Sequence, residues 1–444
     1  MKIKVLCRNP DDYLRETKAD IHKVHRNYDP VLHPFEAGRE YVRARNAVKL
    51  QNLFSKPFIG SLDGHKDGIE CLTKHPTQLT CMLSGCCDGE VRVWDLAEKV
   101  CKRVIQAHTG FVREICFPSD GGYFLTTGDD KTIKQWPIEV PEDGDDVPSN
   151  TIIAKTMLTG MSHHWQKPMF VTCGEKIDLW EESRSVPLRS ISWGVDTHCS
   201  VRFNPIETNL LASCVSNRSI VLYDIRRELP VRKVIMSLKS NKICWNPMEA
   251  FVFTVANEDY NLYSFDLRNL RRPINIHRDH VSAVIDVDYA PTGKEFVSGS
   301  YDKTIRIFSS DKGHSRDIYH TKRMQRLKCV SWTRDNTYIL SGSDEMSIRL
   351  WKARASEKLG LLHPREKVVS DYNEKLKEKY AHHPEISRIA RHRHVPKHIY
   401  NAKKEMHVIR QKAARKQANR RAHSKPGSVP FTSTLHPTIV EEQE

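Results

Sequence analysis

The chain has 444 residues, of which 39% are hydrophobic and 28% are charged, and it carries a formal net charge of +15 at pH 7. It contains no run of about 18 apolar residues and no apolar stretch near its first residue, so we expect neither a membrane-spanning helix nor a secretory signal. Its 12 cysteines are scattered without paired Cys-x-x-Cys motifs, which indicates free thiols in a reducing cytosol or nucleus.

Residues 1–55 form the first region, which is polar and contains several prolines. Because proline interrupts helices, we expect most of this N-terminal arm to be extended. Residues 39–53 are the exception, since Tyr41, Ala44 and Val48 fall on one side of a helix. The arm either wraps along a partner and orders on contact, or it is a plain disordered segment.

The second region, residues 56–352, contains a repeat. Seven aromatic residues recur at intervals of 42 to 44 residues, and each closes a similar phrase with a small residue, a tight turn and an alternating strand. A period of about 40–45 residues that ends in an aromatic residue is typical of WD repeats. The sequence therefore predicts an all-β, seven-bladed WD40 β-propeller. The seven aromatic residues are Trp94, Trp136, Trp180, Tyr223, Phe265, Phe308 and Trp351.

The repeats resemble the WD40 family in their polar residues as well. In that family a His, a Ser or Thr, an Asp and a Trp share hydrogen bonds inside each blade. Because the set recurs in several blades, whereas a catalytic site occurs once and at an opening, we interpret it as structural and expect no enzyme. The matching residues are His65, Ser84, Asp88 and Trp94 in blade one, His108, Thr126, Asp130 and Trp136 in blade two, and His280, Ser298 and Asp302 in blade six, where Phe308 replaces Trp.

Two short segments border the blades. Residues 57–62 precede the first repeat, and we expect them to form the strand that closes the ring by joining the last blade. Residues 140–150 carry four acidic side chains between blades two and three. We interpret this loop as a solvated connector; the alternatives are that it repels nucleic acid or meets a basic protein.

Blades four and five end in two similar boxes, Tyr223-Asp224-Ile225-Arg226 and Phe265-Asp266-Leu267-Arg268. They resemble the W-D-x-R boxes of WD-repeat substrate receptors for cullin-four RING ubiquitin ligases, in which the Arg helps to dock the receptor on its adaptor. The resemblance implies adaptor docking by Asp224, Arg226, Asp266 and Arg268. The alternative is an ordinary Asp–Arg surface pair, which contributes little energy. Since no Gly-rich phosphate loop is present, we expect no nucleotide cofactor.

The last region, residues 353–444, is basic. From Lys352 to Glu444 there are 21 Lys or Arg and 10 Asp or Glu, which gives +11 of the total +15. This asymmetry indicates a polyanionic partner. Because no lipidation motif or amphipathic anchor accompanies it, nucleic acid is favoured over a membrane surface. The alternatives are a solvated surface helix and a nuclear import signal.

Three helices are expected in this region. Val368, Tyr372, Leu376 and Tyr380 form one apolar stripe, and a short helix fits residues 385–394. A basic helix follows over about 398–423, before a loose end from Lys425. The basic helix has too little apolar surface to fold by burial alone, so we expect it to bind RNA. The candidate RNA contacts are Arg391, Arg393, Lys403, Lys404, Arg410, Lys412, Arg415, Lys416, Arg420 and Arg421.

A group of histidines in the same region suggests zinc. No Cys lies nearby, and the spacing matches no known ligand pattern with an acidic partner, so we expect no metal. These residues are His382, His383, His392, His394 and His398.

Longer phrases along the whole chain resemble the Sof family, nucleolar WD-repeat proteins with a Sof-like C-terminal domain whose vertebrate member is described as a cullin-four-associated factor. Examples are residues 26–30, 244–250, 388–394 and 424–428. The resemblance implies a non-catalytic scaffold of the small-subunit processome, required for pre-ribosomal RNA processing. It also implies a nucleolar location, with pre-ribosomal RNA, a small nucleolar ribonucleoprotein and other processome proteins as partners, and neither a membrane nor a small-molecule substrate.

Overall fold

The structure, a computed structural model, describes residues 30–139, 146–227, 229–430 and 439–443. The chain divides into two compact units. One contains the described part of Met1–Leu53 together with Gly360–Ala390, and the other contains Phe54–Leu359 with Arg391–Glu444. This division differs from the three consecutive regions expected from the sequence, because helices from both ends of the chain share one unit.

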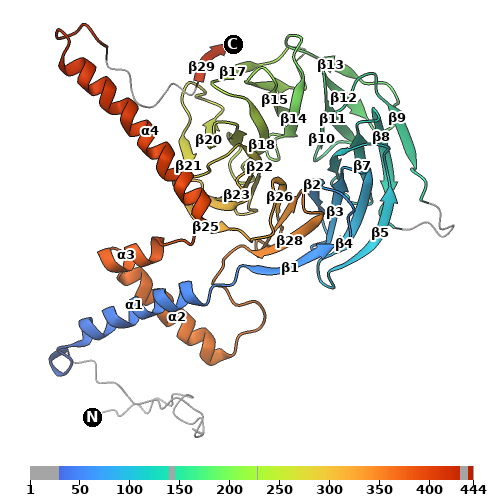
Figure 1. The fold of residues 1–444 in the computed structure, drawn as a ribbon. Coiled ribbons are helices and arrows are strands. Elements are labelled where there is room, and N and C mark those ends of the chain that lie inside the picture. The colour runs from blue at the N-terminus through green and yellow to red at the C-terminus, as the bar shows by residue number, and fades with distance from the viewer. Residues whose placement is uncertain (1–29, 140–145, 228, 431–438, 444) are drawn as a thin grey trace, which may run out of the picture. The chain divides into compact units, whose positions relative to one another are not determined.

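Seven sheets surround a central axis in the larger unit (Figure 1). Each sheet is antiparallel, and its strands follow one another in chain order from the axis outward, except in blade seven, whose outer strand precedes the other three in the chain. This arrangement confirms the seven-bladed propeller. The strands are β2 (Ile69–Lys74), β3 (Cys81–Cys86), β4 (Glu90–Asp95) and β5 (Val100–Gln106) in blade one; β6 (Val112–Cys116), β7 (Tyr123–Gly128), β8 (Thr132–Pro137) and β9 (Asn150–Ile153) in blade two; and β10 (Gly160–His163), β11 (Met169–Cys173), β12 (Ile177–Glu181) and β13 (Arg189–Ile191) in blade three.

The remaining blades follow the same order. They comprise β14 (His198–Phe203), β15 (Leu210–Val215), β16 (Ser219–Asp224) and β17 (Arg232–Met236) in blade four; β18 (Ser240–Trp245), β19 (Val252–Asn257), β20 (Asn261–Asp266) and β21 (Asn275–Arg278) in blade five; β22 (Val284–Tyr289), β23 (Glu295–Ser300), β24 (Ile305–Ser309) and β25 (Ser315–Tyr319) in blade six; and β26 (Leu327–Trp332), β27 (Tyr338–Ser343), β28 (Ser347–Lys352) and β1 (Phe58–Asp63) in blade seven.

The ring closes as expected. Strand β1 pairs with β28 in antiparallel register, with Leu62 opposite Ile348, and so provides the outer strand of blade seven. Both of these side chains are buried. The prediction of a closure strand at residues 57–62 is confirmed, with the strand beginning one residue later. Closure pairs an edge of the last sheet that would otherwise be exposed.

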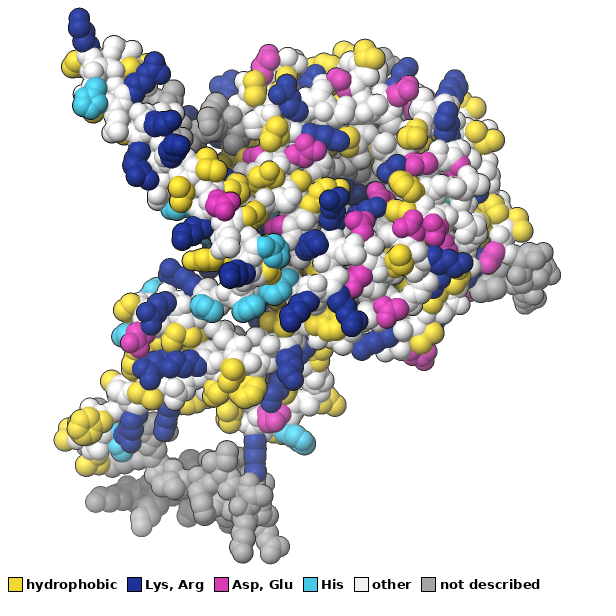
Figure 2. All heavy atoms as spheres, viewed as in Figure 1, with side chains coloured by type: hydrophobic (Ala, Val, Ile, Leu, Met, Phe, Trp, Pro, Cys, Tyr) yellow, Lys and Arg dark blue, Asp and Glu magenta, His cyan; other side chains and the backbone are white. Residues whose placement is uncertain are grey.

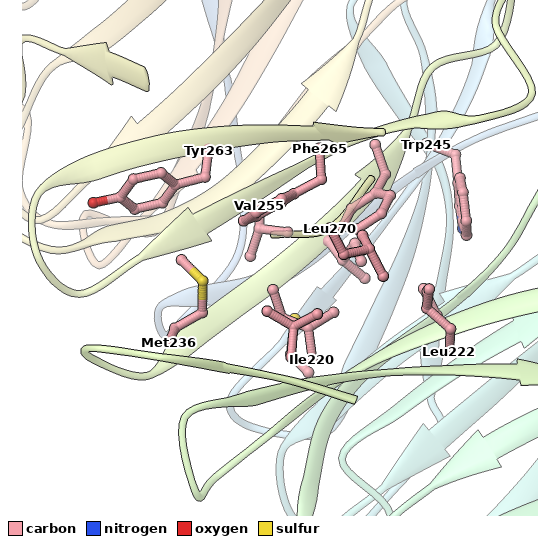
Figure 3. Close-up of a cluster of buried hydrophobic side chains, with 13 residues drawn as sticks. Ile220, Leu222, Met236, Trp245, Val255, Tyr263, Phe265 and Leu270 are labelled. Carbon is pink, nitrogen blue, oxygen red and sulfur yellow. The ribbon is translucent and has the colours of Figure 1, made fainter. Parts of the chain in front are cut away.

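The hydrophobic core lies between neighbouring sheets. Figure 3 shows one such layer, in which Ile220 and Leu222 of blade four face Val255 and Phe265 of blade five. The alternation along each strand creates these layers, because every second side chain points to the same face of a sheet. Phe253 belongs to the same cluster and is 1% exposed.

Hydrogen bonds across the outer edges fix the blades to one another. In four places an arginine of an outer strand donates to a carbonyl oxygen at the end of the third strand in the next blade. Such charge-assisted bonds are directional, so they fix the angle between blades as well as their spacing. The donor–acceptor pairs are Arg103 Nη1 to Pro137 O (2.7 Å), Arg189 Nη1 to Ile225 O (3.0 Å), Arg232 Nη1 to Leu267 O (3.2 Å) and Arg316 Nη2 to Ala353 O (2.7 Å).

The end of the chain forms a strand that the sequence did not predict. Strand β29 (Ile439–Gln443) pairs with β17 in antiparallel register and makes blade four five-stranded. Ile439 packs against the core between blades four and five, and Glu442 Oε2 lies 3.4 Å from Arg271 Nε. The expectation of a loose end is therefore wrong for these residues. The apolar contact of Ile439 and the pairing with β17 order them, and both involve segments that are distant in sequence.

The smaller unit is built from helices α1 (Glu36–Leu53), α2 (Pro364–Lys379) and α3 (Pro384–Arg391), after a short 3-10 turn, η2 (Pro30–Leu32). Ala44 and Val48 of α1 pack against Leu376 and Ile386. The predicted helix at 39–53 is confirmed and begins three residues earlier. Of the predicted stripe on α2, only Leu376 is fully buried, whereas Val368 is 67% exposed, because the small unit offers too little apolar surface to cover it.

Polar contacts complete this helical unit. The Tyr41 hydroxyl donates to Glu385 Oε2 at 2.6 Å, and Lys379 Nζ lies 2.7 Å from Glu40 Oε2. The helical part of the N-terminal arm is therefore a packing partner of the C-terminal helices. Most of the arm, residues 1–29, lies outside the described residues.

Candidate nucleic-acid interface

Helix α4 (Lys397–Ala422) is the basic helix predicted at about 398–423, and its bounds agree within one residue. It begins directly after Pro396, and it is rich in Ala, Lys, Arg and Gln, which favour helices. The helix contains nine Lys or Arg and one Glu. Among the side chains described in α4, only Ile399 is buried. Among the described side chains of α4, full apolar burial is therefore confined to the first turn.

An ion pair holds the first half of α4 to the propeller. Lys403 Nζ lies 2.8 Å from Oδ1 of Asp279, which lies between β21 and β22 and is 7% exposed. Asp279 Oδ2 also accepts hydrogen bonds from the backbone N–H and the hydroxyl of Ser315, at 2.7 and 2.8 Å. Burial alone would raise the pKa of this carboxyl, but the hydrogen bond and charge of Lys403 outweigh burial and hold the pKa well below its usual range.

A second cation of the predicted RNA set also faces the propeller. Arg393 Nε lies 3.3 Å from Asp317 Oδ1 on β25, and it donates to the carbonyl oxygen of Arg316. Lys403 and Arg393 therefore differ from the sequence prediction: their charges are compensated by carboxylates of the propeller, and they act as anchors. Sequence reasoning missed Asp279 and Asp317 because they are far from the tail in sequence.

Seven of the other predicted cations are accessible to a ligand. Arg421 is half-buried, and its Nε lies 3.3 Å from the Gln417 carbonyl oxygen. The rest are exposed, and within the described parts of the chain no carboxylate lies within 4.0 Å of them. Figure 2 shows dark blue side chains along this helix with little magenta between them. These exposed cations are Arg391, Lys404, Arg410, Lys412, Arg415, Lys416 and Arg420.

The spacing of these cations has an energetic consequence. Lys412, Lys416 and Arg420 recur at four-residue steps, which places them on one face of α4. Like charges at that spacing destabilise a helix by about 0.2–0.5 kcal/mol per pair. A polyanion bound along this face would remove the repulsion and release counterions. The geometry thus fits a phosphate backbone.

The two W-D-x-R-like boxes lie in equivalent positions of neighbouring blades. Each begins at the end of the third strand and continues into the connection to the fourth strand, so Arg226 and Arg268 lie on the same rim. Arg226 is exposed, and its backbone N–H donates to Asp224 Oδ1 at 3.0 Å. Arg268 instead forms a surface pair with Asp266, with Nη2 3.0 Å from Oδ2, and its guanidinium lies 4.9 Å from the ring centre of Phe251.

The backbone of both boxes is held from the preceding blade. Arg189 donates to Ile225 O, and Arg232 donates to Leu267 O. The side chains of Arg226 and Arg268 therefore project from rigid turns. Such turns suit a docking surface, because little conformational entropy is lost when they are bound.

The blade networks differ from one blade to the next. In blade two, His108 Nδ1 lies 2.9 Å from Asp130, His108 Nε2 lies 2.9 Å from the Thr126 hydroxyl, and Trp136 Nε1 donates to the same hydroxyl at 3.1 Å. In this blade Thr132 donates to the Asp130 carboxylate at 2.7 Å. Blade six repeats the arrangement without the Trp donor: His280 contacts Asp302 at 2.9 Å and Ser298 at 2.7 Å, Thr304 donates to Asp302 at 2.6 Å, and Phe308 replaces Trp.

Blade one departs from the expected network. His65 and Trp94 both contact the Ser84 hydroxyl, at 2.5 and 2.8 Å, but Asp88 is exposed and His65 Nδ1 has no hydrogen-bond partner among the described residues. The expected role of Asp88 is therefore wrong. The residue two positions after it is Glu90, which has no hydroxyl to hold the Asp carboxylate as Thr132 does in blade two.

A cavity of about 270 Å³ lies on the propeller axis, and its charges compensate one another. The buried Glu114 carboxylate lies 2.6 Å from Arg202 Nη2 and 2.6 Å from Lys242 Nζ. Burial would raise the pKa of Glu114, but these two cations lower it below its usual value. The three side chains come from blades two, four and five, so the ion pairs join blades around the axis.

Further predictions concern membrane helices, metal sites, the cysteines and the acidic loop. Within the described ranges, no helix is long and apolar enough to cross a membrane, and no group of three or more His, Cys, Asp or Glu side chains could hold a metal ion. The described cysteines, including Cys86, Cys173 and Cys214, are free thiols. The acidic loop at 140–150 lies partly outside the described residues; of its carboxylates, Asp146 Oδ1 lies 2.6 Å from Arg103 Nη2.

Comparisons with known proteins cover the chain from end to end. The family described as "Sof1-like domain" matches residues 353–437, and the family "WD domain, G-beta repeat" matches residues 56–95, 99–137, 271–309 and 312–352. "DDB1- and CUL4-associated factor 13" of Xenopus tropicalis is 59% identical over 434 residues, which cover 98% of each chain. The human protein of that name is 60% identical over 441 residues, 99% of each chain.

A relative of lower identity also matches nearly the whole chain. "Protein SOF1" of Saccharomyces cerevisiae is 42% identical over 464 residues, covering 99% of this chain and 94% of its own. Identity at this level over nearly the full length extends to the helical regions as well as the propeller. The chain therefore belongs to the family of Sof1-like WD-repeat proteins.

Proposed function

We propose that this protein is a non-catalytic scaffold of the small-subunit processome, required for pre-ribosomal RNA processing and small-subunit biogenesis in the nucleolus. Its propeller contacts other processome proteins, and its basic flank contacts pre-ribosomal RNA and a small nucleolar ribonucleoprotein. The observation that carries the proposal is α4: its exposed cations lack carboxylate partners among the described residues, while the ion pair of Lys403 and Asp279 fixes the helix to a rigid disc.

The division of cations along α4 supports this proposal. A helix that served only as a solvated surface would gain little from a buried carboxylate such as Asp279. An anchored helix, in contrast, presents its remaining charges at a defined angle to the disc. Electrostatic binding of RNA then becomes binding in a defined orientation, which a scaffold requires.

The test removes charge from α4 without disturbing its anchor. The variant Lys412→Gln, Arg415→Gln and Lys416→Gln should bind RNA more weakly, and the slope of log K against log salt should fall by about 2, because each phosphate contact with a single strand contributes roughly 0.7. Co-sedimentation with pre-ribosomal particles should be lost at a lower salt concentration than for the unmodified protein. A matched control removes three exposed cations near blade three, through Lys155→Gln, Lys167→Gln and Lys176→Gln. Equal behaviour of the two variants would contradict the proposal.

A second function is favoured by the paired boxes and by a relative's name. Since relatives are named for association with DDB1 and CUL4, we infer that this protein also acts as a substrate receptor of a cullin-four RING ubiquitin ligase. Arg226 and Arg268 would dock the adaptor from the same rim. The two functions can coexist, because α4 is attached to different connections of the propeller.

Reversing charge on that rim tests the receptor function. Arg226→Glu with Arg268→Glu should abolish co-purification of the adaptor and leave RNA binding unchanged. The control is Lys66→Glu with Lys176→Glu, which changes two exposed cations in connections of the opposite rim. Retained adaptor binding by the first variant would exclude docking through these boxes.

A further inference from the structure

Tyr301 is an exposed aromatic residue with a cation on its ring. It lies in the turn between β23 and β24 of blade six, and 41% of its surface is exposed. The guanidinium carbon of Arg326, in the connection between β25 and β26, lies 5.7 Å from the ring centre. A planar cation beside an accessible aromatic face is the arrangement that single-stranded nucleic acid binds by stacking.

The surroundings of Tyr301 are basic. Lys303 belongs to the same turn, and Lys322 and Arg323 belong to the same connection as Arg326. All four cations are exposed, and no carboxylate within the parts of the chain that the structure describes lies within 4.0 Å of them. Their charge is therefore uncompensated around the aromatic ring.

Phe111 provides an internal contrast on the same rim. It is 40% exposed, and Arg113 lies 5.0 Å from its ring centre, so its aromatic geometry resembles that of Tyr301. However, Arg113 Nε lies 2.6 Å from Asp129 Oδ1, and the neighbouring Lys328 Nζ lies 2.9 Å from Glu70. The charges around Phe111 are neutralised, and carboxylates there would repel phosphate.

The two connections beside Tyr301 also hold the basic C-terminal segment. The connection at 279–283 carries Asp279, which pairs with Lys403, and its Ala283 carbonyl accepts the Tyr301 N–H at 3.1 Å. The connection at 320–326 carries Arg326 and also His320, whose Nε2 lies 3.3 Å from the His394 carbonyl oxygen. The start of α4 and the ring of Tyr301 are thus fixed by the same short segments.

We propose that Tyr301 and its cations form a second RNA site, which continues the track of α4 onto the propeller. An unpaired base stacks on Tyr301 beside the Arg326 guanidinium, and Lys303, Lys322 and Arg323 hold the phosphates of that strand. The site rests on the RNA scaffold function proposed above and adds a preference for single-stranded segments. An acidic protein segment would use the cations but would gain nothing from the exposed ring, so RNA accounts for both features.

Stacking and phosphate contacts have different signatures, which makes the site testable in the full-length protein with a fluorescent single-stranded RNA of mixed sequence. Tyr301→Ala should weaken binding by roughly 5- to 100-fold, and the salt slope should stay the same, because stacking releases no counterions. Tyr301→Phe keeps the aromatic face and should bind as the unmodified protein does. Phe111→Ala should change affinity by less than about twofold. On a fully paired RNA duplex, the effect of Tyr301→Ala should disappear.

A second variant covers the charges. Lys322→Gln with Arg323→Gln should reduce the salt slope by roughly 1.4 with the single strand. If Tyr301→Ala lowers the thermal stability of the protein, the salt slope of this charge variant still tests the site. Unchanged RNA affinity in a folded Tyr301→Ala protein, together with an unchanged slope in the charge variant, would overturn the site.

The remaining outcomes separate the site from the function on which it rests. Failure of the unmodified protein to bind RNA would contradict the proposed function itself. If poly-glutamate competes equally well for the unmodified protein and for Tyr301→Ala, and Tyr301→Ala keeps full RNA affinity, the surface binds an acidic protein segment and the RNA site is excluded.

Discussion

The propeller and helix α4 share one unit but are stabilised in different ways. Propeller sheets bury large side chains such as Trp332 and Phe253 between blades, and buried charges such as Glu114 are paired. Helix α4 buries Ile399 alone among its described side chains and carries nine cations against one acid. The disc therefore supplies its own stability, whereas α4 depends on an anchor at its start and on counter-charge along its length.

The largest expected effect is a loss of stability in the propeller, and the matching substitution in α4 should have little effect. Phe253→Ala leaves a cavity between blades four and five, and it should lower the free energy of unfolding by about 3–5 kcal/mol. Val408→Ala in α4, where the side chain is 50% exposed, should change it by less than about 0.5 kcal/mol. Denaturant titration of both variants measures their free energies of unfolding. A similar loss of stability in the two variants would contradict the difference between the propeller and α4.

The second effect is a loss of stability in mild acid, which arises in the disc. Burial lowers the pKa of His65, His198 and His277 to about 4, below the value of about 6.5 expected in the unfolded chain. The unfolded state thus binds more protons between these values, so stability is fully present above pH 6.5 and is lost as pH falls. Each histidine should cost about 1 kcal/mol near pH 5.5.

One group opposes this trend. Burial raises the pKa of Asp286 to about 6, so the folded state holds its proton in the same range and gains stability as pH falls. Because the three histidines lower stability and the one carboxyl raises it as the pH falls, the net effect is a loss of stability. Thermal unfolding at several pH values measures this net loss, and His65→Gln should flatten the dependence of stability on pH. A protein that is more stable near pH 5.5 than at pH 7 would contradict these assignments.

The third prediction compares the polar networks in two blades of the propeller. Asp130→Ala in blade two leaves His108 without its carboxylate and should cost about 1–3 kcal/mol. Asp88→Ala in blade one should cost less than about 0.5 kcal/mol, because Asp88 is exposed and does not contact His65. Chemical denaturation of the two variants provides the check. Equal losses would place Asp88 in a network after all.

The smallest effect on global stability concerns the anchor. Lys403→Gln removes the charge that pairs with Asp279, and the Lys403 side chain is about half exposed. The thermal midpoint of the propeller should hardly change, while amide hydrogen exchange in α4 should become faster over its first turns. Exchange of the β22 amides serves as the internal control. Unchanged protection of α4 would show that the ion pair does not position the helix.

Local and periodic signals in the sequence predicted most of the architecture. The spacing that ends at Trp351 predicted the blades, and Pro396 with the dense charge after it predicted α4 almost to the residue. A hydroxyl two positions after the turn acid would have separated blade two from blade one, since Thr132 has one and Glu90 does not. These signals lie within one blade or one helix.

Contacts between distant segments could not be predicted. Lys403 and Asp279 are 124 positions apart, and nothing in either neighbourhood indicates the other. The pairing of β29 with β17 and the packing of Val48 against Leu376 arise in the same way, from surfaces that exist only after folding. The candidate RNA contacts were therefore recognised as cations before their roles could be divided between anchoring and binding.

The most direct test of the central claim is ultraviolet crosslinking of RNA to the protein in cells, followed by identification of the crosslinked peptides. The account predicts crosslinks within residues 404–421 of α4 and at the turn that contains Tyr301, with few on the rim that carries Arg226 and Arg268. An absence of crosslinks from α4, in a protein that still co-sediments with pre-ribosomal particles, would contradict it.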